Sequence, residues 1–375
     1  MQLSETIKLY PTKKQTQQLA RTMSVYIDTV NSLVSDAVMG IDISGYTTKD
    51  VAADLPSALI NQCIRDAKSI VRKHYKACRK AVLMNRRLLK KGSAKRVTAP
   101  HLPVIKRRCC YINNQNFKIN DDCIEFPVMI GGKSKRIAVC IKLTARQKML
   151  LSDAKLGTLR IVYKNNCIVA QVVYHQTENA VRTEGGVMGV DLGILCPAVS
   201  YCDTGKVTFY GNGRQNKYMR RHYAYLRRKL QKAKTPEAVK RINNKEQRIM
   251  RDIDHKLSRA IVNTAIEQNV YTIKLEQLDN IRSATRTSRK NNHSLHTWSF
   301  HRLAQFIEYK ATLAGISVVY VNPAYTSQKC PVCGRVHKTN GRKYHCVCGY
   351  NGHRDIVGAI NICRSTEIVG HRLSA

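Results

Sequence analysis

The stretch GGVMGVDLGILCPAVSYCDTGKVTFYG, from Gly185 to Gly211, places one carboxylate inside an apolar strand. Apolar residues stand on both sides of Asp191, which is typical of a strand buried on both faces. A turn at Asp203–Gly205 separates two segments that are predicted to be further strands. An ionised carboxylate in a buried strand costs free energy unless a cation or a partner compensates it. Asp191 is therefore a candidate functional residue.

The sequence after this stretch alternates between helical and strand patterns. Gln215–Gln268 predicts two long helices interrupted at TPEA. VYTIKLEQL then predicts a buried strand, TWSFHRLAQFIEYKATLAG a helix ending at Gly315, ISVVYVNP a strand and RDIVGAINICRS a last helix. Strands followed by α-β-α-β-α is the element order of an RNase H-like nuclease domain. That step is an analogy of fold, so the site residues have to carry the function.

The N-terminal half has a different organisation. SETIKLYPT predicts a strand closed by Pro11, and two helical stretches follow, one from Leu19 to Val38 and one over about 57–89. Between His101 and His175 the hydrophobic period becomes two, which predicts antiparallel strands joined by short turns.

The charge of the chain indicates a polyanionic partner. Among 375 residues, 64 are Lys or Arg and 25 are Asp or Glu, so the formal net charge is +39. Nucleic acid fits such an excess, because neutralised phosphates release counterions. A ribosomal-type or membrane-surface protein is the alternative. The sequence has neither a membrane-spanning segment nor an apolar signal-peptide core, so we expect a cytoplasmic protein whose 14 cysteines are thiols and metal ligands.

Two further acids resemble Asp191 in their setting. Glu276 lies in the predicted strand YTIKLEQL, and Asp355 opens the last predicted helix. We expect the three acids to converge and to bind Mg²⁺, which prefers carboxylate oxygens. Two such ions about 4 Å apart would activate a water and stabilise the leaving oxygen of a phosphodiester. The order Asp, Glu, Asp differs from the Asp, Asp, Glu of cut-and-paste transposases.

Four cysteines have the spacing of a zinc ribbon. Cys330-x2-Cys333 is followed after 12 residues by Cys346-x-Cys348. Four thiolates would close a tetrahedral coordination sphere, so the predicted Zn²⁺ is structural. The second pair is one residue tighter than the usual spacing, and His345 or His337 is an alternative fourth ligand.

The best candidate segment for nucleic-acid binding is NKYMRRHYAYLRRKLQKAK, from Asn216 to Lys234. Its apolar residues form a packing stripe at helical spacing. The basic residues off that stripe are predicted to contact phosphates, with an ordinary solvated face as the alternative; they are Arg220, Arg221, Arg227, Arg228 and Lys232. RSATRTSRKNNHS is either a basic lid over the cut strand or a linker, and its candidates are Arg286, Arg289 and Lys290.

The chain resembles the TnpB family on four motifs, which occur in the order GVDLG, KLEQL, NPAYTSQKCPVCG and CGYNGHRDIVGAINI. TnpB proteins are compact nucleases encoded by insertion sequences and are relatives of the type V CRISPR effectors. The motifs cover the region from about Gly186 to Arg364. The resemblance implies an α+β multidomain chain with a RuvC-like, RNase H-like nuclease domain at 183–375. It also implies a zinc ribbon at about 326–350, a wedge β-barrel from 1–11 and 101–182, and a helical recognition lobe at 12–100.

The resemblance also implies an activity and partners. The expected function is RNA-guided cleavage of double-stranded DNA beside a short flanking motif, with a guide RNA from the host transposable element of a prokaryote. The acidic triad of the family corresponds to Asp191, Glu276 and Asp355, and its ribbon ligands correspond to the four cysteines. The sequence departs from the family pattern at the tight Cys-x-Cys pair and at Val357 and Gly358, where Asn-Ala is common.

Two other functions stay open on the sequence. One is a nucleic-acid-binding regulator or transposition accessory protein that does not cut. The other is a nuclease that cuts without a guide.

Overall fold

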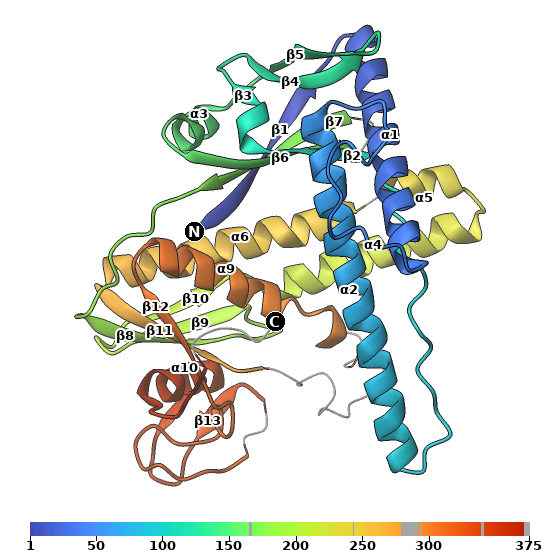
Figure 1. The fold of residues 1–375 in the computed structure, drawn as a ribbon. Coiled ribbons are helices and arrows are strands. Elements are labelled where there is room, and N and C mark those ends of the chain that lie inside the picture. Colours follow the sequence, from blue (N-terminus) through green and yellow to red (C-terminus); the bar gives the residue numbers. More distant parts are fainter. Residues whose placement is uncertain (165–166, 243, 279–291, 293–294, 339–340, 371–375) are drawn as a thin grey trace. The chain divides into compact units, whose positions relative to one another are not determined.

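The computed structural model describes residues 1–164, 167–242, 244–278, 292, 295–338 and 341–370. The chain divides into two compact units, Met1–Gln176 and Thr177–Ala375, and each has its own sheet and hydrophobic core (Figure 1). Within the described residues, no helix combines the length and the hydropathy needed to cross a membrane.

The first unit is a seven-stranded antiparallel sheet with a helical insertion after its first strand. The strand order is β2-β6-β7-β1-β5-β4-β3, so the first strand of the chain lies in the middle. Most of β1 pairs with β7, and its last two residues pair with β5. The strands are β1 (Gln2–Tyr10), β2 (Cys109–Ile112), β3 (Lys118–Ile119), β4 (Cys123–Ile130), β5 (Lys133–Ile141), β6 (Lys155–Lys164) and β7 (Cys167–His175).

The insertion consists of the two long helices that the hydrophobic spacing predicts. They are α1 (Lys13–Val38) and α2 (Ser57–Lys90), and a short helix α3 (Ala145–Ser152) follows β5. Leu19 and Met23 of α1 are fully buried. Tyr26 of α1 donates a 2.7 Å hydrogen bond to Asp66 of α2, which ties the two helices together.

The second unit is built on a six-stranded mixed sheet with the order β10-β9-β8-β11-β12-β15. Its three middle strands β8, β11 and β12 are parallel, and the other three are antiparallel to their neighbours. The strands are β8 (Gly186–Asp191), β9 (Ala198–Cys202), β10 (Val207–Tyr210), β11 (Val270–Glu276), β12 (Ser317–Val321) and β15 (Ile368–Gly370). A separate two-stranded sheet joins β13 (Lys343–His345) to β14 (Asn351–His353).

Helices lie on both faces of this sheet (Figure 1). On one face α6 (Lys245–Glu267) and α9 (Phe300–Leu313) pack on the strands, and on the other face lies α10 (Arg354–Arg364). Two further helices, α4 (Gly213–Lys232) and α5 (Pro236–Ile242), pack on each other, and α4 also packs on α6. Met188, Val190 and Leu275 form the core with α6 and α9. The residues that alternate with these along β8 and β11 face α10. Lys274 is one of them, and its ammonium donates to the carbonyl of Cys363 at 2.9 Å. The alternating side-chain direction of a strand thus separates a hydrophobic face from the face that carries the acids.

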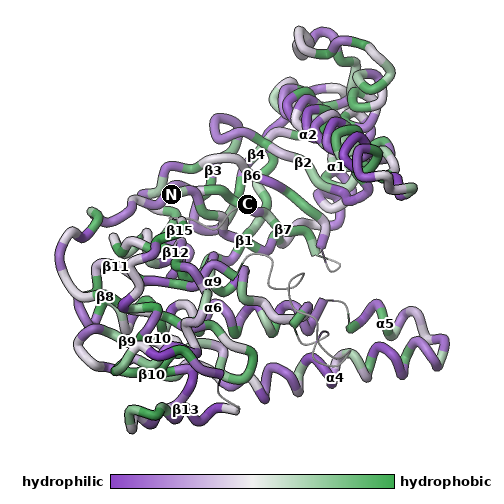
Figure 2. The backbone as a smooth tube through the Cα atoms, turned by 90° about the horizontal axis from the view of Figure 1, so that it is seen from below, coloured by the Kyte–Doolittle hydropathy of each residue, from purple (hydrophilic) through white to green (hydrophobic). Residues whose placement is uncertain are grey.

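The predicted alternation of helices and strands in this unit is confirmed, with one difference at TPEA. The interruption is itself a short helix, α5, which begins at Pro236. Proline is favoured at the first position of a helix because its missing N–H would have no partner there. Hydrophilic residues dominate α4 (Figure 2), in which Gly213 and Tyr223 are the buried residues.

Candidate active site

Asp191 and Glu276 end two neighbouring parallel strands. Asp191 is the last residue of β8, and Glu276 is the last residue of β11. Val190 and Leu275 are partners in the ladder, so the two acids follow at matching positions. Because parallel strands end at the same edge of a sheet, the carboxylates lie beside each other at the edge where α/β proteins bind ligands.

Asp355 reaches the same edge from α10, of which it is the second residue. Its backbone N–H donates to His353 Nδ1 at 3.3 Å, at the beginning of the helix. The helix approaches β8 closely because Gly189 has no side chain: a Cβ there would lie 2.3 Å from the carbonyl oxygen of Ala359. A Cβ on Gly358 would likewise lie 3.0 Å from Asp191 Oδ2, so a side chain at position 358 would crowd this carboxylate.

Burial dominates the electrostatics of the two strand acids. It raises the pKa of Asp191 well above the usual range of an aspartate, and the nearby carboxylates of Glu276 and Asp355 raise it further. Burial also raises the pKa of Glu276, and a hydrogen bond donated by Thr326 Oγ1 opposes this effect. Carboxylates that raise one another's pKa in this way ionise at low cost only when positive charge is supplied.

Arg342 supplies one such charge. Its guanidinium forms an ion pair with both carboxylate oxygens of Asp355, and Arg342 and Arg354 both lower the pKa of Asp191. The carbonyl of Arg342 accepts a 2.8 Å hydrogen bond from the N–H of Arg354, which fixes the arginine beside the beginning of α10. The sequence analysis missed Arg342 and Thr326, because one basic residue among 64 and one threonine carry no distinguishing signal.

The carboxylates are a suitable donor set for a hard divalent cation. Among the residues that the structure describes, the cysteines are the one group of three or more potential ligands whose donor atoms all lie within 4.8 Å of one another. The three acids are therefore more widely spaced, with Arg342 bound to one of them. Carboxylate oxygens are the donors that Mg²⁺ prefers, and a cation would offset the cost of ionising Asp191.

The four predicted cysteines form this compact group. Cys330 Sγ lies 3.6 Å from Cys348 Sγ, and Cys333 Sγ lies 3.5 Å from Cys346 Sγ. Sulfurs at about 2.3 Å from a tetrahedral zinc ion would be about 3.8 Å apart, so the spacing fits. The tight Cys-x-Cys pair thus brings both its sulfurs to the group.

The two histidines considered as alternative ligands have other contacts. His337 Nε2 lies 2.7 Å from the carbonyl oxygen of His345, and His345 Nδ1 lies 2.5 Å from Asn351 Oδ1.

Within the cysteine group, the pKa of one thiol is lowered and the pKa of another is raised, so the first proton is lost more easily than the next. Although burial opposes it, the N–H groups of Cys333 and Val332 and the neighbouring thiols lower the pKa of Cys330 to about 6. Although the N–H of Cys348 opposes it, burial and the neighbouring thiols raise the pKa of Cys346 to about 12. A bound cation removes this conflict, because metal ligation requires thiolates and compensates their charge.

The cysteine group packs directly on the helix that carries Asp355. Tyr344 and Val357 share one small core with Cys330 and Cys346. Asn361 of α10 donates two 2.7 Å hydrogen bonds to carbonyls of the segment before the first cysteine. The ribbon and the beginning of α10 therefore form one packed assembly.

The basic residues predicted on α4 have unequal environments. Arg227 Nη2 is paired with Glu246 Oε2 of α6 at 2.6 Å, so part of its charge is compensated within the protein. Arg220 is half-buried and lines a cavity. The remaining three are exposed, namely Arg221, Arg228 and Lys232. Arg286, Arg289 and Lys290 lie outside the described residues.

Comparisons with known proteins find two family models and several relatives that are similar to parts of this chain. A family model described as "Probable transposase" matches residues 170–282, and "Cas12f1-like, TNB domain" matches residues 300–362. The TnpB-like protein MJ0751 of Methanocaldococcus jannaschii is 29% identical over 68% of this chain and 94% of its own length.

The chain is similar in sequence to the TnpB-like proteins.

The chain is also similar to larger proteins. A CRISPR-associated endodeoxyribonuclease Cas12f1 of Sulfoacidibacillus thermotolerans is 39% identical over 29% of this chain, a region that is 25% of that protein's length. A putative RNA-guided DNA endonuclease, InsQ of Escherichia coli, is 26% identical over 57% of this chain and 61% of its own length. The fold resembles that of Cas12f1 in a Cas12f1–sgRNA–target DNA complex, with a TM-score of 0.64 at 15% identity over 94% of this chain and 82% of that chain.

The raised pKa of Asp191 predicts a pH-dependent gain in stability for Asp191→Asn in protein without added Mg²⁺. Because the pKa is higher in the folded state than in the unfolded state, ionisation of Asp191 destabilises the fold as the pH rises. The loss is about 1.4 kcal/mol for each pKa unit by which the two states differ. The variant should therefore be more stable than the wild type at pH 8 in urea unfolding without added Mg²⁺. The difference should shrink as the pH falls toward the ordinary aspartate range.

Asp252→Asn is the matched control, because Asp252 is an exposed acid of α6 paired with Lys256 at 2.7 Å. It should show no comparable gain. A stability difference for Asp191→Asn that is absent, or constant with pH, would contradict the electrostatic assignment.

Proposed function

We propose that the chain is a divalent-metal-dependent DNA endonuclease that takes its target specificity from a guide RNA. One observation carries the proposal: Asp191, Glu276 and Asp355 meet at one edge of a sheet in a chain of net charge +39. Buried clustered carboxylates are costly unless they bind cations, and a phosphodiester backbone is a polyanion that matches the positive charge.

The second unit is, in this proposal, a RuvC-like nuclease domain of the RNase H type. Its sheet has three parallel strands between antiparallel ones, with helices on both faces. The fold similarity to Cas12f1 supports the assignment. In the same proposal the nuclease domain is 183–375, with the ribbon at about 326–350.

The three acids are the proposed ligands of Mg²⁺. When bound, Mg²⁺ would supply a water-derived nucleophile and stabilise the leaving oxygen of the phosphodiester. Asp191 and Glu276 present carboxylates from rigid strands, and the hydroxyl of Thr326 orients Glu276. Arg342 holds Asp355 as an ion pair and has to share or release this carboxylate when a cation binds.

The assignment of a guide RNA and a double-stranded DNA target to this chain rests on proteins to which it is similar. InsQ is named an RNA-guided DNA endonuclease, and the Cas12f1 structure is a complex with sgRNA and target DNA. We assign 1–11 and 101–182 to a wedge barrel and 12–100 to a recognition lobe. The exposed basic side chains of α2 suit an RNA backbone, among them Arg72, Lys73, Lys76, Arg79 and Lys80.

Asp191→Ala should abolish target cleavage while binding of guide RNA and target DNA survives. The substitution removes a metal ligand and leaves the basic surfaces unchanged. The co-purifying RNA is sequenced, a target matching its variable segment is offered with Mg²⁺, and cleavage and binding are measured on gels.

Asp252→Ala should cut like the wild type. Full activity of Asp191→Ala would refute the site. A wild type that binds target DNA but cuts under no guide would favour a regulator that does not cleave, and cleavage that ignores changes in the guide would favour a guide-independent nuclease.

The cysteine group is the proposed structural Zn²⁺ site, and Cys330→Ser should lower both bound zinc and thermal stability. A structural zinc ion contributes its binding free energy to folding. Zinc is measured by elemental analysis of the purified protein, and unfolding by thermal melting.

Cys140→Ser is the matched control, because this cysteine is exposed on β5 and lies outside the group. It should leave both quantities unchanged. Full zinc content in Cys330→Ser would exclude Cys330 as a ligand.

A further inference from the structure

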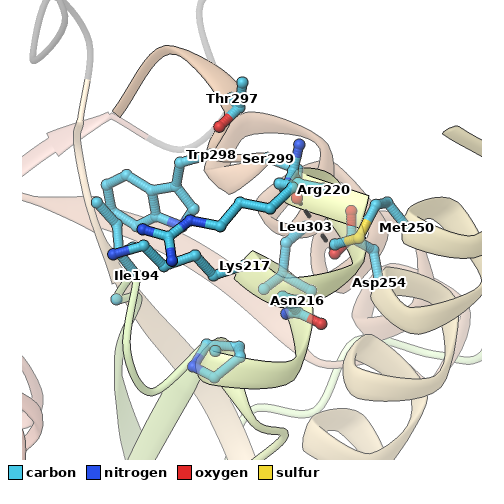
Figure 3. A pocket seen from close by; sticks show the side chains of 14 residues that line it. Ile194, Asn216, Lys217, Arg220, Met250, Asp254, Thr297, Trp298, Ser299 and Leu303 are labelled. Atoms are coloured by element: carbon cyan, nitrogen blue, oxygen red, sulfur yellow. Dashed lines mark hydrogen bonds between the residues drawn. The ribbon is translucent and has the colours of Figure 1, made fainter. Parts of the chain in front are cut away.

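A cavity of about 180 Å³ lies beside the candidate active site in the second unit. It is lined by the turn after β8, the first part of α4, α6 and the beginning of α9 (Figure 3). Gly193, on its wall, is two residues after Asp191. The volume is below the range of about 300–1,000 Å³ that is usual for whole small-molecule ligands, so the cavity suits one ring or one base of a longer ligand.

The cavity combines one aromatic side chain with three cations. Trp298 forms one wall, and Lys217, Arg220 and Arg221 come from α4. Figure 3 shows the side chains of Lys217 and Arg220 extending across the cavity toward the indole of Trp298. An aromatic face next to clustered Arg and Lys is the combination that binds a base and its phosphate in single-stranded nucleic acids.

The charge of Arg220 is not compensated locally. In the described part of the chain this half-buried guanidinium has no hydrogen-bond or ion-pair partner. The two acids whose charges act on Arg220 each have another partner: Glu246 pairs with Arg227 at 2.6 Å, and Asp254, which itself lines the cavity, pairs with Arg302 at 2.6 Å. Burial lowers the pKa of Arg220, and these two acids oppose the shift. A half-buried cation without a direct partner carries a desolvation cost, and an anionic ligand would reduce that cost.

We propose that this cavity holds one unstacked nucleotide of single-stranded DNA, with the base against Trp298 and the phosphate at Lys217, Arg220 and Arg221. The choice of DNA rests on the proposed function, because a strand bound here would lead to the acids from the adjacent turn after β8. The cavity then positions the strand and takes no part in the chemistry.

Trp298 reports on its own site, because it is the only tryptophan of the chain. The full-length chain without added Mg²⁺, so that metal-dependent cleavage does not proceed, is titrated with single-stranded oligothymidylate and with an abasic oligonucleotide of equal length. The thymidylate should quench tryptophan fluorescence saturably. The abasic strand should bind about tenfold or more weakly without such quenching, since one stacked base contributes about that much.

Variants separate the base from the phosphate, with affinity measured by anisotropy of a labelled oligonucleotide. Trp298→Leu should lose the preference for thymidylate over the abasic strand, and Trp298→Phe, which keeps a ring, should retain more of it. Arg220→Gln should reduce the slope of log affinity against log salt by about 0.7, the value for one phosphate contact on a single strand. Arg241→Gln removes an exposed arginine of α5 away from the cavity and should change neither quantity.

Equal quenching by the abasic strand, or an Arg220→Gln slope equal to that of Arg241→Gln, would overturn the proposal, as would tight quenching by thymidine monophosphate alone. All readouts are binding measurements without added Mg²⁺. A chain that binds this way but never cuts would contradict the proposed function and leave this inference standing. If the chain cuts DNA in a way that requires Asp191 but shows no base-dependent quenching, this inference is wrong and the proposed function stands.

Discussion

The account depends on the cost of placing ionisable carboxylates side by side in a buried setting. Asp191 and Glu276 end neighbouring parallel strands, and burial raises the pKa of both. A protein that needed only stability would place apolar residues at these strand ends. The cost is explained if the acids bind cations, and Arg342 supplies part of the positive charge in the structure described here.

Close packing then decides where the third acid lies. Gly189 lets α10 approach β8 to backbone contact, and Gly358 leaves room for the carboxylate of Asp191. The cysteine group packs on the same helix through Val357, and Arg342 reaches from it to Asp355. We infer that the ribbon fixes the beginning of α10 and thereby the third acid, so two different metal chemistries are linked although their ligands are separate.

Local patterns in the sequence were sufficient to predict the long helices and the central strands of the second unit, although not the short elements α5, β13, β14 and β15. The spacing of the cysteines predicted their grouping. Periodicity and metal-ligand spacing depend on neighbours in the chain, which a sequence displays directly. The ion pair of Arg342, the hydrogen bond of Thr326 and the cavity at Trp298 depend on tertiary contacts, and no local pattern marks them. The ion pair of Arg227 with Glu246 also depends on a tertiary contact, and the phosphate contact predicted for Arg227 stays a prediction.

The central claim is that the three acids bind a divalent cation, and anomalous diffraction from crystals of the full chain soaked in Mn²⁺ tests it most directly. Mn²⁺ takes the same oxygen donors as Mg²⁺. The account predicts an anomalous peak coordinated by carboxylate oxygens of Asp191, Glu276 and Asp355, with the ion pair between Arg342 and Asp355 loosened or broken. A site without Mn²⁺, in which Arg342 keeps both oxygens of Asp355 at saturating metal, would contradict it.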